Sequence, residues 1–370
     1  MPSYVGNKIA VFVLQAMGCD VAALNTVQFS QSPEMRIIRK RGQLVNIHAG
    51  NHTGYKQWKG TKSTAQEISD LYIGLKESYL DDFDMMLSGY IPGAEAVNAV
   101  GSIAAELREK YRSSPGRFFW VLDPVMGDNG RLYVAEDVVP AYKKLVSHAD
   151  LILPNQFEAE YVIGQHASPA RGPVMLTMIP RQLSGVKITD LQSLIQAIQV
   201  LHDSYHIPHI VITSVNLSAP DAHLSVVGST MTSAGKARLF KIVFPTIDGY
   251  FVGTGDMFAA LMVVRLREAA VTAGVSGNAS WLSGDDVATL DLPLAKAARK
   301  VLASMHEVLT KTAEGMPRVV ERTEREIGKG EEGDEKRAHL VKSKASELAL
   351  VRNLGCLQAP EVSFEALIIE

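Results

Sequence analysis

The sequence predicts an α/β fold with a mostly parallel central sheet, for three reasons. Short apolar runs alternate with longer amphipathic stretches, which is the pattern of repeated strand–helix units. One of these runs, 118–122, is apolar at every position, as expected of a strand covered on both faces. The length of 370 residues, 46% of them hydrophobic, is enough for one large domain with a substantial core. We therefore interpret residues 1–370 as a single domain.

The first predicted element is a helix over 6–17, which Gly18 ends because glycine adopts a left-handed cap at little cost. A strand over 21–29 follows it. The next helix starts at a cap on Ser63 or Thr64 and runs to 79, with Glu67 three residues after Thr64 as in a capping box. The remaining predicted strands cover 85–88, 118–122, 151–153, 209–213, 224–229, 238–244 and, as an edge strand, 362–369; the remaining helices cover 94–110, 137–146, 189–204, 255–270 and 294–312.

Three stretches do not fit this alternation. Residues 31–50 are basic and irregular, and they interrupt the chain after the strand predicted over 21–29. Residues 166–187 have the character of an extra surface loop. Residues 318–344 are dense in charge and glycine, which predicts a flexible surface loop.

Composition excludes several classes of function. Lys and Arg number 37 against 40 Asp and Glu, and this balance argues against binding nucleic acid through a basic surface. No apolar run approaches the roughly 20 residues of a membrane helix, and the N-terminus has no apolar signal core. The two cysteines, Cys19 and Cys356, have no metal-binding spacing, which suits a reducing compartment. We expect a cytoplasmic chain that engages neither nucleic acid nor membrane.

The most informative segment is the glycine turn at 253–255, just before a predicted helix of small apolar residues. Gly253-Thr254-Gly255 can turn sharply and bring backbone N–H groups against a ligand, and the positive end of the helix points into the same space. This predicts a site for a phosphate or a migrating phosphoryl group, with Asp256 in the first helical turn facing it. The alternative is that Asp256 is simply the N-cap of the helix.

Polar groups also follow several predicted strands. Asp123 and Asp128 come after the strand over 118–122, at the strand end where open α/β sheets bind ligands. An ordinary Asp/Gly turn would explain them equally well. Asn155 follows the strand over 151–153, and it either belongs to the same site or caps the next helix with Glu158 as its capping-box partner.

Two more strand ends add to this pattern. Thr213 and Ser214 end the strand over 209–213, and Asn51-His-Thr-Gly-Tyr55 follows the interrupted strand. Turns and caps alone do not predict polar groups at four or five strand ends pointing the same way. We therefore expect one ligand site at the carboxyl edge of the sheet.

Taken together, these segments resemble the pyridoxal kinases of the ribokinase-like superfamily. The Gly-Thr-Gly-Asp turn ending at Asp256 marks the superfamily, while Val27-Gln-Phe-Ser30, Asn51-His-Thr-Gly-Tyr55 and Tyr4-Val-Gly-Asn7 narrow the match to the pyridoxal kinase branch. The resemblance covers roughly 4–312. It implies a three-layer α/β/α sandwich and ATP-dependent phosphorylation of the 5′-hydroxymethyl group of pyridoxal, pyridoxine or pyridoxamine.

The resemblance also implies roles for single residues. Asp256 matches the catalytic base, and Gly253, Thr254 and Gly255 match the anion hole. Positions lining the pyridine pocket are Val5, Val27, Phe29, Thr53 and Tyr90, next to Asp256; positions on the nucleotide side are Asp123, Asn155, Thr213, Ser214, Phe251, Thr254 and Gly255; and positions associated with cations or their waters are Asp128, Glu158 and Thr213. The implied cofactors are ATP and Mg²⁺, with a monovalent cation such as K⁺ as an option, and the implied assembly is a cytosolic homodimer.

The sequence departs from the family in three places. Members begin with a strand and a serine-bearing loop, whereas Met1-Pro-Ser3 stands there in this chain, so we expect a central strand to be missing. The family has no counterpart of 31–50, which we interpret as an insertion whose removal improves solubility. Leu153 replaces a threonine that is common in the family, which weakens any monovalent-cation site.

Two alternatives remain open at this point. A related kinase, such as one for hydroxymethylpyrimidine, would keep the Gly-Thr-Gly-Asp turn but not the segment Asn51–Tyr55. A catalytically impaired homologue, serving as a binding or dimerisation protein, is favoured by the missing first strand.

Overall fold

The structure, a computed structural model, describes residues 6–29, 43–48, 60–128, 130–163, 186–217, 223–327 and 335–370. In this part of the chain a nine-stranded sheet has the order β1-β3-β5-β6-β9-β10-β11-β12-β13. Neighbouring strands from β1 to β10 are parallel, and those from β10 to β13 are antiparallel. The strands are β1 (Asp20–Asn25), β3 (Gln43–His48), β5 (Met85–Ser88), β6 (Phe119–Leu122), β9 (Leu151–Ile152), β10 (His209–Val215), β11 (His223–Met231), β12 (Ala237–Pro245) and β13 (Ala366–Ile369).

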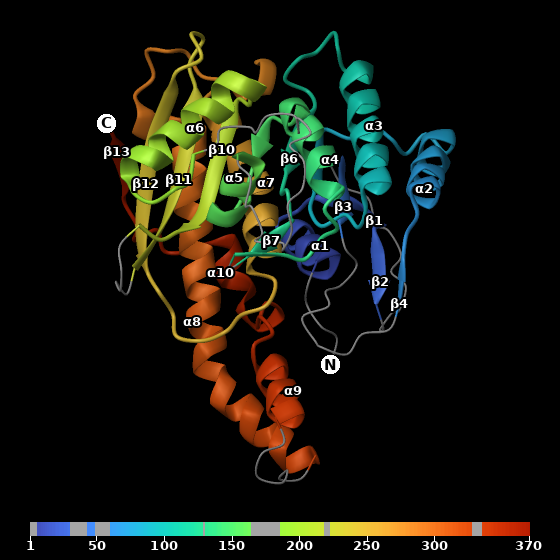
Figure 1. Cartoon of the computed structure of the whole chain (residues 1–370), viewed down its shortest axis with the longest axis vertical. Helices are drawn as coiled ribbons and strands as arrows, with labels where there is room; N and C mark the ends of the chain where they lie inside the picture. The colour runs from blue at the N-terminus through green and yellow to red at the C-terminus, as the bar shows by residue number, and fades with distance from the viewer. Residues whose placement is uncertain are drawn as a thin grey trace, which may run out of the picture.

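Helices cover both faces of this sheet, so the predicted three-layer α/β/α sandwich is confirmed (Figure 1). One layer contains α1 (Asn7–Ala16), α7 (Thr254–Thr272), α8 (Pro293–Ile327) and α10 (Leu354–Gln358). The other contains α2 (Ala65–Glu77), α3 (Ala94–Lys110), α4 (Val138–Leu145), α5 (Gln156–Ile163) and α6 (Leu191–Tyr205).

Strand β6 shows why the sheet needs two apolar faces. Its residues are all buried, as the apolar run predicts, and they alternate between the two layers. Trp120 and Leu122 belong to the core under α3 and α4, while Phe119 and Val121 belong to the core under α7 and α8.

The predicted capping box of α2 is confirmed. The Thr64 hydroxyl accepts the backbone N–H of Glu67 at 3.1 Å, and the Glu67 carboxylate accepts the backbone N–H of Thr64 at 2.7 Å. These two bonds satisfy N–H groups that have no partner within the helix. Local sequence therefore fixes where this helix begins.

The strand predicted over 21–29 is two strands in two different sheets. β1 lies at the edge of the main sheet, and β2 (Val27–Phe29) pairs antiparallel with β4 (Gly60–Lys62) in a separate ribbon. A third small sheet pairs β7 (Gly127–Asp128) with β8 (Arg131–Leu132). The division at Thr26 was not predicted because both halves are apolar and β-prone.

The expectation of an irregular insertion over 31–50 is wrong for residues 43–48. These residues form β3, which pairs in parallel with β1 on one side and β5 on the other. Leu44 and Val45 are buried in opposite layers of the core. The sheet is thus continuous from β1 through β3 to β5. Residues 31–42, 49 and 50 lie outside the described part.

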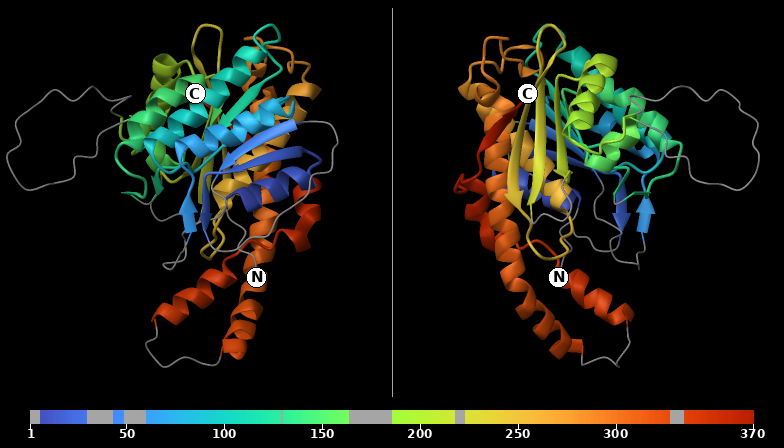
Figure 2. Two further views of the ribbon diagram at one scale, coloured as in Figure 1. Left: turned by 90° about the vertical axis from the view of Figure 1, so that its right-hand side faces the viewer. Right: turned by 60° about the vertical axis from the view of Figure 1, so that its left-hand side comes forward.

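The flexible loop predicted over 318–344 is also wrong for the described residues there. α8 continues to Ile327 and is 35 residues long, and α9 (Glu335–Ala345) packs against it. Figure 2 shows these two helices extending together from the body of the molecule. The charges that resembled a solvated loop are spaced for a helix, with pairs such as Glu321–Arg325 and Arg322–Glu326.

Of the extra loop predicted over 166–187, all but the last two residues lie outside the described part of the chain. The described helices include none that is both long enough and apolar enough to cross a bilayer.

Candidate active site

The carboxyl ends of β6, β9 and β10 meet the N-terminus of α7 at one edge of the sheet. Asp123 follows β6, Asn155 follows β9, and Thr213 lies in β10, where it forms a parallel bridge with Asn155. A Cβ atom placed on Gly255 would lie 3.9 Å from Oδ2 of Asp123. The strand ends and the glycine turn, far apart in sequence, therefore face each other as predicted.

The glycine turn opens α7 in the expected way. Gly253 is the N-cap residue with φ 82°, a left-handed conformation that a side chain would strain. Thr254, Gly255 and Asp256 then form the first turn, whose backbone N–H groups have no helical acceptor. The turn therefore has the donors and the helix dipole that an anion requires.

Asp256 is not the cap of α7, because Gly253 occupies that position. Oδ2 of Asp256 accepts the backbone N–H of Gly6 at 2.7 Å. Gly6 is itself the N-cap of α1, so the N-termini of α1 and α7 meet at this carboxylate. Sequence reasoning missed Gly6, although a glycine directly before a helix in the resembling segment was the available signal.

Glu158 is held by three residues around the ends of β6 and β9. Its carboxylate accepts backbone N–H groups of Met126 at 2.8 Å, Gly127 at 3.3 Å and Asn155 at 3.0 Å. Asn155 Oδ1 accepts the N–H of Glu158 at 2.8 Å, which is the predicted capping box, and Asn155 Nδ2 donates to the Gly127 carbonyl at 2.9 Å. Glu158 thus shapes the loop after β6 as well as capping α5.

The carboxyls of this site repel one another. Burial raises the pKa of Glu158 to about 7, against the opposing effect of its three backbone N–H donors. Burial, and then the carboxyls of Glu158 and Asp256, raise the pKa of Asp123 well above its ordinary value. Such a crowded set of carboxyls is stabilised by a nearby cation.

The other predicted nucleotide and cation positions lie around this centre. The backbone N–H of Thr213 donates to the Pro154 carbonyl at 3.0 Å. Ser214, the next residue, is exposed with φ 55°, at an irregularity in the pairing of β10 with β11. Asp128 is exposed in β7, and Phe251 is half-buried against the core of the α7–α8 layer.

Among the positions expected to line a pyridine pocket, Val27 is fully buried and packs against Tyr90. Thr26 Oγ1 donates to the Tyr90 carbonyl at 2.8 Å, which fixes the ribbon β2–β4 beside the loop after β5. Phe29 lies in β2. Val5 and Thr53, also expected in the pyridine pocket, lie outside the described residues.

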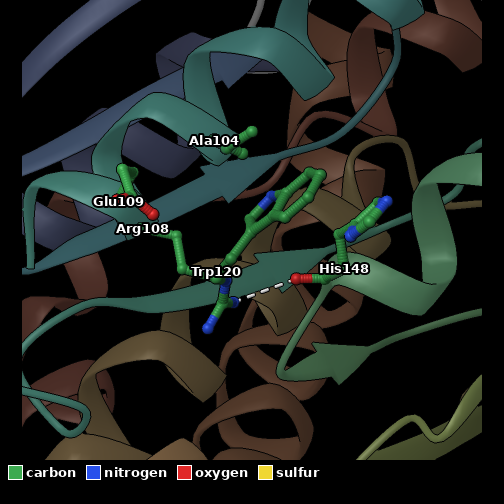
Figure 3. A pocket seen from close by; sticks show the side chains of 6 residues that line it. Ala104, Arg108, Glu109, Trp120 and His148 are labelled. Carbon is green, nitrogen blue, oxygen red and sulfur yellow. Dashed lines mark hydrogen bonds between the residues drawn. The ribbon is translucent and has the colours of Figure 1, made fainter. Parts of the chain in front are cut away.

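A shallow pocket elsewhere is unrelated to this site. It is lined by Ala104, Ala105, Arg108, Glu109, Trp120 and His148, and Arg108 Nη2 donates to the His148 carbonyl at 2.9 Å (Figure 3). Trp120 stands at the start of β6, whereas Asp123 follows its end, so the pocket lies toward the opposite edge of the sheet. Among the described residues, no group of three or more His, Cys, Asp or Glu side chains is arranged to hold a metal ion.

The chain is similar to pyridoxal kinases in both sequence and structure. It is 32% identical over 312 residues to a Schizosaccharomyces pombe protein provisionally named pyridoxal kinase. The aligned region covers 84% of this chain and 82% of that protein. It is 35% identical over 271 residues to the pyridoxal kinase of Ovis aries, and the aligned region covers 70% of this chain and 72% of that protein. The structure of Leishmania donovani pyridoxal kinase with ADP and pyridoxamine matches with a TM-score of 0.69 and 27% identity, over 100% of this chain and 96% of that chain. No family model matches the chain.

Proposed function

This chain belongs to the pyridoxal kinase family, and on that premise we propose that Asp256 is the base with which it phosphorylates B6 vitamers. The reaction transfers the γ-phosphoryl group of ATP to the 5′-hydroxymethyl group of pyridoxal, pyridoxine or pyridoxamine. The observation that carries the proposal is the position of Asp256, held by the Gly6 N–H at the mouth of α7 and facing the carboxyl edge of the sheet.

Phosphoryl transfer needs only a weak base but an accurately arranged site around it. Phosphoryl transfer has a loose transition state, so the protein mainly positions groups and neutralises charge. Asp256 takes the proton of the alcohol late, when attack has already made that oxygen acidic. The backbone N–H groups of Thr254 and Gly255 and the dipole of α7 receive the charge that develops on the migrating group.

Mg²⁺ fits the donor set of the site. Mg²⁺ usually takes one or two carboxylates together with phosphates and waters, which does not require three protein ligands. Asp123 and Glu158 are buried carboxyls whose pKa values are raised by burial and by their acidic neighbours. We propose that these two, with Asp128 and Thr213, face the cations, where a bound Mg²⁺ supplies neutralising charge at the phosphates.

The remaining residues hold the two substrates. Asn155, Thr213, Ser214 and Phe251 are the proposed nucleotide side, supported by the bridge between Asn155 and Thr213. Val27 and Tyr90 are the proposed walls of the vitamer pocket, where an apolar and an aromatic surface suit a pyridine ring. The proposed setting is a cytoplasmic homodimer.

The experiment is an assay of the purified chain with ATP, Mg²⁺ and each vitamer, following formation of the phosphorylated vitamer and ADP. We expect turnover with B6 vitamers and a much lower kcat/KM with hydroxymethylpyrimidine. A chain that binds pyridoxal and ADP but forms no phosphorylated vitamer would instead be an impaired homologue. A preference for hydroxymethylpyrimidine would overturn the proposed substrate class.

A further inference from the structure

Asn7, in the first turn of α1, fastens that helix to the carboxyl end of β1. Its side chain is 3% exposed. Nδ2 of Asn7 donates to the Leu24 carbonyl at 3.1 Å and to Oδ1 of Asn25 at 2.6 Å. Buried amide bonds of this kind fix local geometry, because breaking one leaves a polar group without a partner.

Asn7 directly follows the residue that contacts the base. The N–H of Gly6 donates to Asp256, while the Gly6 carbonyl accepts the N–H groups of Ile9 and Ala10 at 3.0 Å. Gly6 has φ 62°, in a region that glycine adopts as readily as many other backbone conformations. The orientation of its N–H therefore depends on the contacts that hold the neighbouring residues. The bonds of Asn7 thus hold the residue next to Gly6, whose N–H contacts Asp256.

The same network continues to the substrate side. The Ser63 hydroxyl donates to the Asn25 carbonyl at 2.8 Å, and the Ser63 N–H donates to the Thr26 carbonyl at 2.9 Å. Thr26 in turn donates to the Tyr90 carbonyl. Hydrogen bonds, together with the peptide link between Gly6 and Asn7, thus connect Asp256 to the ribbon β2–β4 and to Tyr90.

We propose that Asn7 is a positioning residue for phosphoryl transfer, acting through Gly6 on the carboxylate of Asp256 and through Asn25 on the vitamer pocket. This inference rests on the proposed function. Rates of reactions between bound groups are sensitive to misplacement of about 1 Å, which is the scale of movement that loss of a side-chain clamp allows. Asp123, Asn155 and Thr213 on the nucleotide side lie at β6, β9 and β10, whereas the bonds of Asn7 go to β1, so we expect nucleotide binding to depend on Asn7 less than turnover does.

The test is Asn7→Ala, measured against the matched control Asn353→Ala. Asn353 also donates its side-chain amide to a backbone carbonyl, that of Ala349 at 2.7 Å, but it lies near α10. We expect kcat of Asn7→Ala to fall between about 10- and 100-fold, with the Kd for ADP within about twofold of wild type. Asn353→Ala should keep wild-type kcat.

Substitutions of Asn25 test the same bond by changing its acceptor, and they provide the test if Asn7→Ala does not fold. Asn25→Leu removes the acceptor oxygen, whereas Asn25→Asp keeps one. We expect Asn25→Asp to retain more turnover than Asn25→Leu. The double variant Asn7→Ala/Asn25→Leu should lose less than the product of the single losses, because both changes break one interaction.

The outcomes separate this inference from the function on which it rests. If Asp256→Asn is inactive but Asn7→Ala turns over as fast as Asn353→Ala, the positioning role is refuted and the function stands. A parallel loss of kcat, ADP binding and thermal stability in Asn7→Ala would also refute it, since that pattern reports general loosening. Normal turnover of Asp256→Asn would overturn the proposed function itself.

Discussion

At the scale of single residues, Gly255 is a position where a substitution should lower activity without lowering stability. A Cβ atom at this position would lie 3.9 Å from Asp123 Oδ2, which is ordinary contact, and no left-handed conformation is required. A methyl group there would nevertheless narrow the space between the turn and Asp123, where we propose that a phosphate binds. We therefore expect glycine here to serve the close approach of a ligand rather than folding.

We predict that Gly255→Ala keeps or raises the melting temperature while lowering kcat/KM for ATP at least about 10-fold. Alanine in a helix is favoured over glycine by roughly 1 kcal/mol, so the fold should not suffer. Thermal unfolding and steady-state kinetics on the same preparation give the answer. Wild-type kinetics in this variant would show that no phosphate approaches Gly255.

Glu158 makes stability depend on pH. Its folded-state pKa of about 7 lies above the ordinary value near 4.5, so the folded protein holds a proton that the unfolded chain releases. The protonated carboxyl therefore contributes stability that is fully present below pH 4.5 and is lost as pH rises through 7.

Glu158→Gln should remove this dependence. We predict that wild type loses up to about 3 kcal/mol of unfolding free energy relative to Glu158→Gln between pH 4.5 and 7. Urea unfolding of both proteins at several pH values, without added divalent cation, measures the difference. A difference that stays constant over this range would contradict a raised pKa.

At the scale of elements, β3 decides whether the sheet is continuous. Leu44 and Val45 face opposite layers, and both neighbours of β3 pair with it in parallel. We expect removal of 31–50 to destroy soluble folding, the reverse of what the family pattern suggested. The family resemblance led us to expect an insertion here, whereas the part that six of its residues play in the sheet depends on pairing with strands distant in the chain.

Val45→Asp tests the strand with one substitution. An unpaired charge in the core costs several kcal/mol, so we predict loss of soluble protein. Ala23→Asp, at an exposed position of β1, is the matched control and should be tolerated. Soluble expression and thermal unfolding compare the two. A stable, soluble Val45→Asp protein would show that β3 is not part of the core.

Among the helices, too, features set by neighbouring residues were predictable from the sequence, and features set by packing between distant segments were not. The cap of α2, the turn before α7 and the Asn155–Glu158 capping box were all predictable, because each involves residues three or fewer positions apart. The extension of α8 was missed although its charges are spaced for a helix, because their density resembled a loop and the packing against α9, where Val341 and Ala345 are buried, is not local.

At the scale of the whole molecule, the site exists because distant parts of the chain converge on one edge of the sheet. Motifs identified the strand ends and the glycine turn, since their polar groups follow apolar runs. The contact between Gly6 and Asp256 spans 250 positions, and no local pattern reveals it. Family membership supplies the reaction, and this convergence supplies the reason that Asp256 is the residue to test.

The most direct measurement is therefore turnover of Asp256→Asn with pyridoxal and ATP, together with the affinity of the variant for ADP. The asparagine keeps the shape of the side chain and an acceptor for the Gly6 N–H but cannot take the alcohol proton. We predict that kcat falls at least about 100-fold while the Kd for ADP stays close to wild type, as it should in the exposed-residue control Asp203→Asn. A kcat near that of wild type would contradict the role of Asp256 as the base for phosphoryl transfer.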